Sequence, residues 1–230
     1  GSGLAEMVKL AVPVPPGFTI PTGVGRAFHE NGRAPKRLAW HMVQSVKGIE
    51  RQTGRKFGGT TKPLLVSVRS GARTSMPGMM DTVLNLGLND IAVESLALET
   101  GNEHFALDSY RRLISMYGEI VMGFHKGKFG GEADTPSGLR TLIQEHKNVF
   151  TKHKKAFPQD PWTQLSGAVK AVFGSWESER ANAYRKANKI PTWWNTACTV
   201  QAMVFGNLGE TSATGVVFSA DPATGKPGLY

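Results

Sequence analysis

The chain has 230 residues, of which 40% are hydrophobic and 20% are charged, so it is long enough for one large domain or two small ones with an apolar core. No apolar run approaches the roughly 20 residues that span a bilayer, and no basic-then-apolar leader opens the chain, so we expect a cytoplasmic protein without a membrane partner. The single cysteine, Cys198, excludes an internal disulfide and fits a reducing compartment.

The formal net charge of +9 is typical of proteins that bind phosphate-rich partners, either nucleotides or nucleic acids. Much of this charge is local, because residues 140–190 hold ten Lys or Arg against four Asp or Glu. The stretch 147–155 (KNVFTKHKK) is typical of one solvated helix face. Charge alone does not choose between a nucleotide and a nucleic acid.

The first third of the chain predicts an extended segment, a helix and a strand. Residues 11–20 (AVPVPPGFTI) carry three prolines and a glycine, which disfavour a helix. Apolar residues at helical spacing follow from Leu38, and Gly54 ends that run. Residues 64–69 read as a strand, which places Val66 and Val68 on one face with Leu64, and Ser67 and Arg69 on the other.

The rest of the chain is mostly helical until its last part. Apolar residues at helical spacing over 110–124 predict a long amphipathic helix, and shorter helices are expected near 139–150 and 164–173, with Trp162, Trp176, Trp193 and Trp194 as packing residues. Strands are expected at 199–205 and 215–219, followed by a turn at 221–225 (DPATG). This order predicts an α+β fold in which a mostly helical insert, residues 91–195, interrupts a unit formed by residues 1–90 and 196–230.

Residues 67–82 (SVRSGARTSMPGMMDT) form the most unusual segment of the chain. Its small residues let the backbone turn tightly and bring N–H groups close to an anion; they are Ser70, Gly71, Ser75 and Gly78. Two guanidinium groups, Arg69 and Arg73, are suited to gripping phosphate oxygens. The segment lacks the Gly-Lys-Ser/Thr of a Walker loop.

Three methionines, Met76, Met79 and Met80, surround Pro77 and offer a soft surface to a flat ligand such as a purine. Asp81 is expected either to cap a following helix or to support a magnesium ion. A glycine-rich turn with paired arginines and core methionines explains the same residues equally well.

The stretch SVRSGARTSMPGMMDTVLNLGLND, residues 67–90, closely resembles the signature of pyruvate, phosphate dikinases. Further matching segments follow in order along the chain: LAEM (4–7), PVPPGFTI (13–20), DSYRRLI (108–114), FPQDPWTQL (157–165), VQAMVFGN (200–207) and TGVVFSADPATG (214–225). The related pyruvate, water dikinases and rifampicin phosphotransferases have an acidic loop in place of the Met-Pro-Gly-Met-Met run, so the phosphate-using family fits better.

The resemblance implies a modular enzyme that uses ATP, Mg²⁺, phosphate and pyruvate and forms AMP, diphosphate and phosphoenolpyruvate. Its N-terminal, ATP-grasp-like domain passes the βγ-pyrophosphoryl group of ATP to a histidine on a separate swivelling domain. A pyruvate-binding barrel domain then exchanges the remaining phosphoryl group with pyruvate. These two domains are the expected partners of this chain, with no nucleic acid, and a homodimer would form through other domains.

The resemblance also carries over site residues. Arg69 matches an arginine that contacts the transferring phosphates, so it is predicted to be catalytic as well as ATP-binding. The loop from Ser75 to Met80 would fold over the nucleotide, and the segment from Gln201 to Met203 would line the adenine side. The predicted ATP-binding residues are Arg69, Arg73, Ser75, Met76, Gly78, Met79, Met80, Gln201 and Met203.

Two parts of the family's site are expected outside this sequence. A Gly-Lys-Gly turn whose lysine holds the ATP phosphates would precede Gly1, and the acidic magnesium ligands would follow Tyr230. We therefore expect an incomplete ATP-grasp-like domain that is inactive alone. Two alternatives stay open: a regulatory module that binds ATP without transferring it, and a basic nucleic-acid-binding module. The second would need alternating aromatic and basic residues on a sheet or a recognition helix, and the sequence shows neither.

Overall fold

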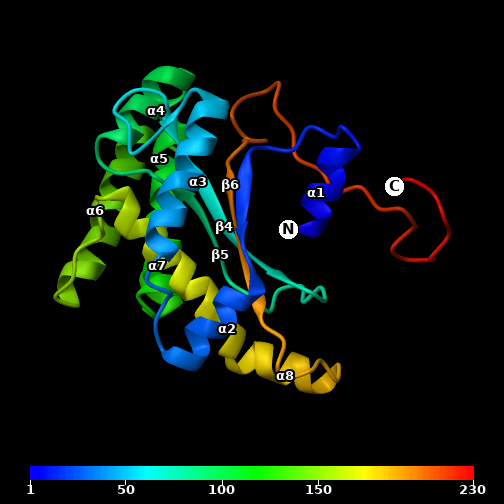
Figure 1. Ribbon diagram of the computed structural model, residues 1–230. Helices are drawn as coiled ribbons and strands as arrows, with labels where there is room; N and C mark the ends of the chain where they lie inside the picture. The colour runs from blue at the N-terminus through cyan, green and yellow to red at the C-terminus, as the bar shows by residue number, and fades with distance from the viewer.

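The structure, a computed structural model, describes residues 1–230 and is built around one antiparallel four-stranded sheet (Figure 1). In spatial order its strands are β1 (Gly17–Ile20), β6 (Thr196–Ala202), β4 (Val66–Ala72) and β5 (Thr82–Leu86). A separate short parallel pair joins β2 (Lys56–Phe57) to β3 (Pro63–Leu64). Helices and an antiparallel sheet in one chain confirm the α+β class.

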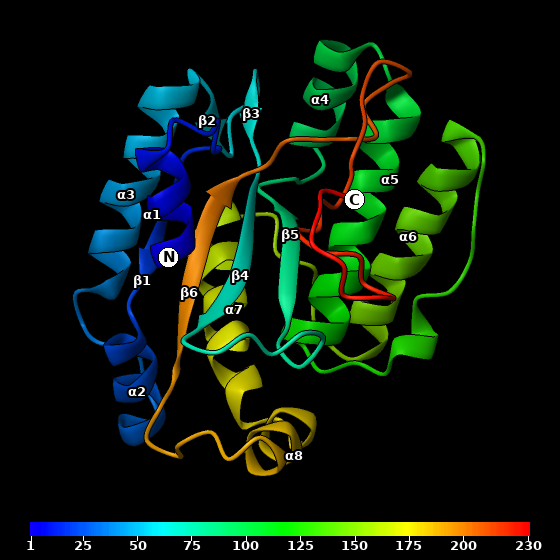
Figure 2. The same cartoon turned by 90° about the vertical axis from the view of Figure 1, so that its right-hand side faces the viewer.

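Most helices lie on one face of the sheet, and the opposite face, which we call the uncovered face, is largely free of them (Figures 1 and 2). In Figures 1 and 2, α3 (Leu38–Thr53), α5 (Glu103–Met116) and α7 (Pro161–Gly174) lie on one side, whereas α1 (Ser2–Lys9) and the last residues of the chain lie on the other. The remaining helices are α2 (Thr22–Asn31), α4 (Ala92–Thr100), α6 (Pro136–Lys152) and α8 (Glu179–Ala187), with the short helical turns η1 (Tyr117–Val121), η2 (Lys126–Lys128) and η3 (Ser175–Glu177). None of these helices combines the length and the apolar composition that a bilayer crossing requires.

Alternation along the strands explains this arrangement. Val66 and Val68 on β4 and Val200 on β6 are each 0% exposed, because their side chains point toward the helices. Burying one such side chain stabilises the fold by roughly 1.5–3 kcal/mol. One cluster of 35 buried residues contains these strand residues together with residues of α3, α4, α5, α6 and α7. The helical segment 91–195 therefore shares its apolar core with the sheet.

Local signals in the sequence account for most helix ends. α3 runs from Leu38 to Thr53 and is followed by Gly54 with φ +66°, which confirms the predicted helix and its end. α6 and α7 each begin with a proline after a capping side chain: Thr135 accepts a hydrogen bond from the Gly138 N–H, and Asp160 accepts from two backbone N–H groups. These two helices confirm those expected near 139–150 and 164–173.

A helix and a strand have boundaries that differ from the predictions. The helix expected over 110–124 starts earlier, at Glu103, and passes into the π-helical turn η1, which ends at Val121 before Gly123 with φ +70°. The strand expected at 199–205 runs instead over Thr196–Ala202, because its first residues pair with Ser70, Gly71 and Ala72 of β4.

The strand expected at 215–219 does not form. Phe218 exchanges backbone hydrogen bonds with Tyr230 alone, at 3.0 and 3.1 Å, and the next contact is an isolated bridge between Ala220 and Pro227. A strand needs a continuous neighbour to satisfy its N–H and C=O groups, and residues 215–217 have none. The predicted turn at 221–225 is present, with the Gly225 N–H donating to the Asp221 carbonyl oxygen at 2.8 Å.

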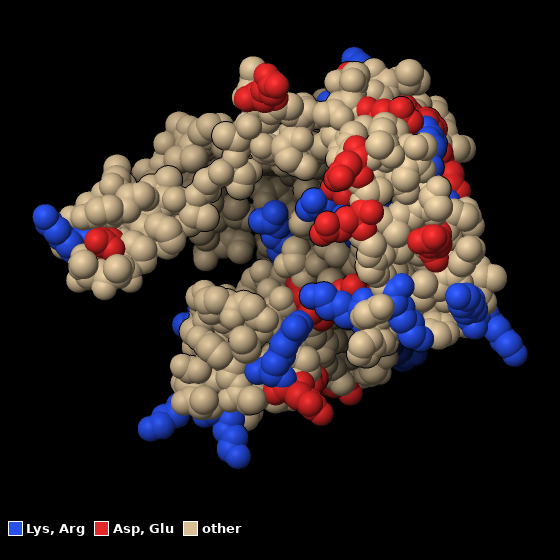
Figure 3. Space-filling model, turned by 180° about the vertical axis from the view of Figure 1, so that it is seen from behind, with Lys and Arg blue, Asp and Glu red and all other residues tan.

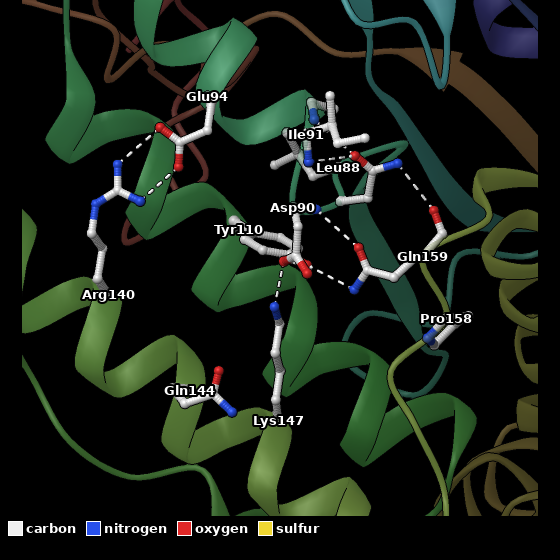
Figure 4. Close-up of polar contacts among 12 residues, drawn as sticks. Leu88, Asp90, Ile91, Glu94, Tyr110, Arg140, Gln144, Lys147, Pro158 and Gln159 are labelled. Atoms are coloured by element: carbon white, nitrogen blue, oxygen red, sulfur yellow. Dashed lines mark hydrogen bonds and ion pairs between the residues drawn. The ribbon is translucent and has the colours of Figure 1, made fainter.

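A polar network ties the helical layer together at its surface (Figure 4). The Tyr110 hydroxyl donates to the Asp90 carboxylate at 2.8 Å, and Lys147 pairs with the same carboxylate. Gln159 closes the network, since its amide nitrogen donates to the Tyr110 hydroxyl and its oxygen accepts from the Asp90 N–H. The charge pattern of 147–155 predicted a wholly solvated face. Lys147 departs from that prediction, because it packs against Tyr110 of α5.

Candidate functional site

The sheet face opposite the helices carries the predicted arginine. Arg69 on β4 lies between Thr82 of β5 and Thr199 of β6 in the strand register, and its side chain is exposed. Thr199 in turn faces Thr19 of β1, with the two hydroxyl oxygens 3.0 Å apart. The predicted alternation along β4 is confirmed at Val66, Val68 and Arg69, so the guanidinium group emerges among hydroxyl groups.

The strand continues past Arg69 further than predicted. Ser70 and Gly71, expected in a tight turn, are paired with Cys198 and Ala197 of β6. The Gly71 N–H donates to the Thr196 hydroxyl at 3.1 Å, so this amide is already satisfied. β6 pairs with them in antiparallel orientation as far as Ala72, and the turn starts only at Arg73. Gly78, with φ +72°, supplies the backbone conformation that the turn requires.

The methionines of the turn face the protein. Met76 is 8% exposed and packs with Trp176 and Ala181, and Met79 and Met80 pack against the same small cluster. Ser75 remains exposed at the tip of the turn. A nucleotide could reach Met76 only after the turn moves away from α8.

Asp81 differs from its predicted roles. It precedes strand β5 and therefore caps no helix, and its carboxylate pairs with Arg180 of α8. Its N–H donates to the Ser175 hydroxyl at 3.2 Å, and Arg180 Nε donates to the Met79 carbonyl oxygen at 3.1 Å. These contacts hold the end of the turn against η3 and α8, which follow directly after the C-terminal end of α7.

A polar pocket of about 390 Å³ opens beside the turn. We call it the arginine pocket, because Arg26 of α2 and Arg73 line it and neither forms an ion pair. The Arg73 guanidinium carbon lies 5.0 Å from the Trp194 ring centroid, a cation–π contact that holds the side chain in place. Its lining contains no Asp or Glu; the residues are Gly1, Ser2, Thr19, Thr22, Arg26, Gly71, Ala72, Arg73, Trp193, Trp194, Asn195 and Ala197.

Two further pockets flank the end of the sheet that carries Gln201. The first, of about 360 Å³, lies beneath α1 and is lined by Gln201, Thr199 and Thr19 among others. Gln201 Nε2 donates to the Pro15 carbonyl oxygen at 2.9 Å, which fixes its amide. The second, of about 430 Å³, is mainly apolar and includes Met203 and Phe205. The two predicted adenine-side residues thus line different pockets.

The molecular surface is hollowed on the uncovered side. Figure 3 shows a recess between the C-terminal tail and the lower part of the molecule that carries α8, with Lys or Arg atoms in its depth. Nowhere do three His, Cys, Asp or Glu side chains gather in a way that could hold a metal ion. Cys198 is 0% exposed on the helix-covered face, and burial raises the pKa of its thiol to about 12, which confirms a packed thiol.

Sequence reasoning missed part of this site. Arg26 lies on α2, a helix that the sequence did not predict, and Asn195 carried no motif. Trp193 was expected to be a packing residue, but it is 63% exposed and lines the arginine pocket. Trp176, in contrast, is buried as expected. Only the fold brings residues 26, 73 and 195 to one place.

Comparison with known proteins identifies the family. The family model described as "Pyruvate phosphate dikinase, AMP/ATP-binding domain" matches residues 32–230. The chain is 47% identical over 247 residues to pyruvate, phosphate dikinase of Clostridium symbiosum and 49% identical over 250 residues to that of Rhizobium meliloti. It is 45% identical over 246 residues to the chloroplastic pyruvate, phosphate dikinase of Mesembryanthemum crystallinum.

These alignments cover 100% of this chain but only 28%, 27% and 26% of the three relatives, in the same order. The match extends through the Arg69 strand, the 73–81 turn and β6, which together frame the uncovered sheet face. The chain therefore belongs to the pyruvate phosphate dikinase AMP/ATP-binding domain family.

Proposed function

We propose that this chain is the ATP-binding part of a pyruvate, phosphate dikinase and that its uncovered sheet face receives the nucleotide. One observation supports this most directly: Arg69 and Arg73 stand on or beside that face without a carboxylate partner, next to a pocket lined by no acidic residue. Unpaired guanidinium groups suit an anionic ligand, because each can donate two hydrogen bonds to the oxygens of a phosphate group.

The proposed reaction belongs to the whole protein. A histidine nitrogen on a swivelling domain attacks the β-phosphorus of ATP, the bond from that phosphorus to the α–β bridging oxygen breaks, and AMP leaves with the oxygen. Phosphate then takes the terminal phosphoryl group to give diphosphate, and pyruvate takes the remaining one to give phosphoenolpyruvate. The swivelling domain and a pyruvate-binding domain are thus the proposed partners, together with a homodimer contact elsewhere.

Within this scheme the chain's own residues bind and orient. Arg69 would stabilise the charge that develops on the phosphates, because its guanidinium group is fixed on a strand and not on a flexible loop. Arg73 would hold a phosphate oxygen from the neighbouring pocket. The remaining proposed ATP contacts are Ser75, Met76, Gly78, Met79, Met80, Gln201 and Met203. Magnesium would neutralise phosphate charge in the whole protein, although no three His, Cys, Asp or Glu side chains of this chain gather to hold it.

We also propose an ATP-grasp-like architecture, divided into residues 1–90 and 196–230 on one side and the mostly helical residues 91–195 on the other. The continuity of the sheet supports this division, since β6 returns to pair with β4 and β1 after the helical segment. We also propose a cytoplasmic location, because the one cysteine is a free thiol and free thiols are typical of reducing compartments.

The test uses the full-length protein with ATP labelled at the β-phosphorus. Transfer of label to protein with release of AMP supports the proposal, and label should then move to phosphoenolpyruvate when phosphate and pyruvate are added. ATP binding without AMP release under any of these conditions would instead favour a regulatory module. Absence of ATP binding to the full-length protein would contradict the proposed function itself.

A further inference from the structure

The arginine pocket contains more donors than the proposed ATP contacts use. Arg26 faces it from α2 and Arg73 from the turn, so two positive charges approach one cavity with no carboxylate to balance them. Unbalanced like charges in one pocket repel each other, and a bound anion relieves that repulsion.

A buried side chain points to the same ligand independently. Asn195 is 8% exposed and lines the pocket. Its Oδ1 atom accepts a hydrogen bond from the Thr196 N–H at 2.9 Å, whereas its Nδ2 group makes no hydrogen bond within the protein. Gly25 of α2 lies close to the same oxygen: a Cβ atom added to this glycine would be only 2.6 Å from Asn195 Oδ1. The amide is therefore held through Oδ1, and its Nδ2 donor has no partner within the protein.

We propose that the arginine pocket is an oxyanion site that takes a phosphoryl group, gripped by Arg26 and Arg73 and oriented by Asn195. This inference rests on the proposed function and adds Arg26 and Asn195 as binding residues. Two guanidinium groups and an amide N–H match the oxygens of a tetrahedral dianion, and the Thr22 hydroxyl on the pocket wall offers a further donor.

The phosphoryl group has two chemical sources, free inorganic phosphate and the phosphate chain of a nucleotide. The pocket lies directly beside Gly71, two residues along β4 from Arg69, so a phosphate here would sit next to the face that is proposed to bind ATP. A pocket of about 390 Å³ is large enough for either source.

The experiment titrates the full-length protein with inorganic phosphate and, separately, with ATP, at constant ionic strength set by chloride. Trp193 and Trp194 line the pocket, so their fluorescence reports its occupancy, and calorimetry gives the affinity independently. The variants are Arg26→Gln, which removes one charge, and Asn195→Asp, which keeps the shape but turns a carboxylate oxygen toward the anion. Arg33→Gln, an exposed arginine just beyond the same helix, is the matched charge control.

Phosphate should bind, and both pocket variants should weaken that binding about tenfold or more while Arg33→Gln does not. Competition between ATP and phosphate would assign the pocket to the nucleotide's phosphates, and simultaneous binding would assign it to free phosphate. The proposal is overturned if phosphate has no effect beyond chloride and both variants bind ATP like the wild type. Phosphate binding that survives both substitutions would also overturn it, whereas failure of ATP alone to bind would contradict only the proposed function.

Discussion

Arg180 and Asp81 form an ion pair that joins helix α8 to the end of the turn carrying the methionines. The same arginine donates from Nε to the Met79 carbonyl oxygen, so one side chain fixes two points of the 73–81 turn. Two residues 99 positions apart in the sequence thereby hold this turn against α8.

Removing Arg180 should release the turn. Its side chain is 51% exposed, so the ion pair is worth only about 0.2–1 kcal/mol. Arg180→Ala should therefore speed hydrogen exchange of residues 74–81 by up to about fivefold without changing global stability. Arg112→Ala is the control, because Arg112 is 59% exposed and pairs with Asp108 far from the turn. Addition of ATP and magnesium should slow exchange of the turn in the wild type. Exchange that is equally slow in Arg180→Ala would show that the methionine cluster alone holds the turn.

Arg69→Ala should separate catalysis from folding. Because the side chain is exposed and makes no ion pair, the melting temperature should stay within about 2 °C of the wild type. In the full-length protein, formation of AMP from ATP should fall by about a hundredfold or more, while exchange between phosphoenolpyruvate and pyruvate stays near normal. Arg69→Lys should recover only part of the rate, since an ammonium group does not make the paired contacts of a guanidinium group. Equal losses in both half-reactions would count against a role at the phosphates.

Two glycines of α2 should respond oppositely to alanine. A Cβ atom on Gly25 would lie 2.6 Å from both Asn195 Oδ1 and the Thr196 carbonyl oxygen, so Gly25→Ala should cost about 1–3 kcal/mol of unfolding free energy. A Cβ atom added to Gly23, on the same helix, would have no other heavy atom within 4 Å. Gly23→Ala should therefore be neutral or stabilising by up to about 1 kcal/mol. Urea unfolding of the two variants measures both values. A tolerated Gly25→Ala would mean that α2 does not pack tightly on the start of β6.

The Cys198 thiol should behave as a buried group. Burial raises its pKa from the ordinary 9.0 to about 12, so the folded state holds the proton more tightly than the unfolded state does. This contribution to stability is complete below about pH 9 and is lost as the pH rises toward 12. At pH 8 an aromatic disulfide reagent should label the protein only after unfolding in denaturant, with one thiol per chain. Rapid labelling of the native protein would show that β6 opens locally.

The sequence by itself determined the fold class, the helices whose caps it encodes and the face from which Arg69 emerges. α3 with Gly54, α6 with Thr135 and α7 with Asp160 rest on local backbone chemistry, and alternation of apolar and polar residues sets the direction of side chains along β4. The motif at residues 67–90 indicated the family for the same reason, because its residues are contiguous.

Tertiary structure decided what depends on distant contacts. β4 extends to Ala72 because β6 supplies hydrogen-bond partners from 125 residues further along, and no local pattern encodes that pairing. Met76 is buried because α8 returns to cover it, although its own segment suggests an exposed loop. The arginine pocket joins Arg26, Arg73 and Asn195 from three separate parts of the chain. Their convergence is a property of the packed fold, since nothing in the spacing of these residues relates one to another.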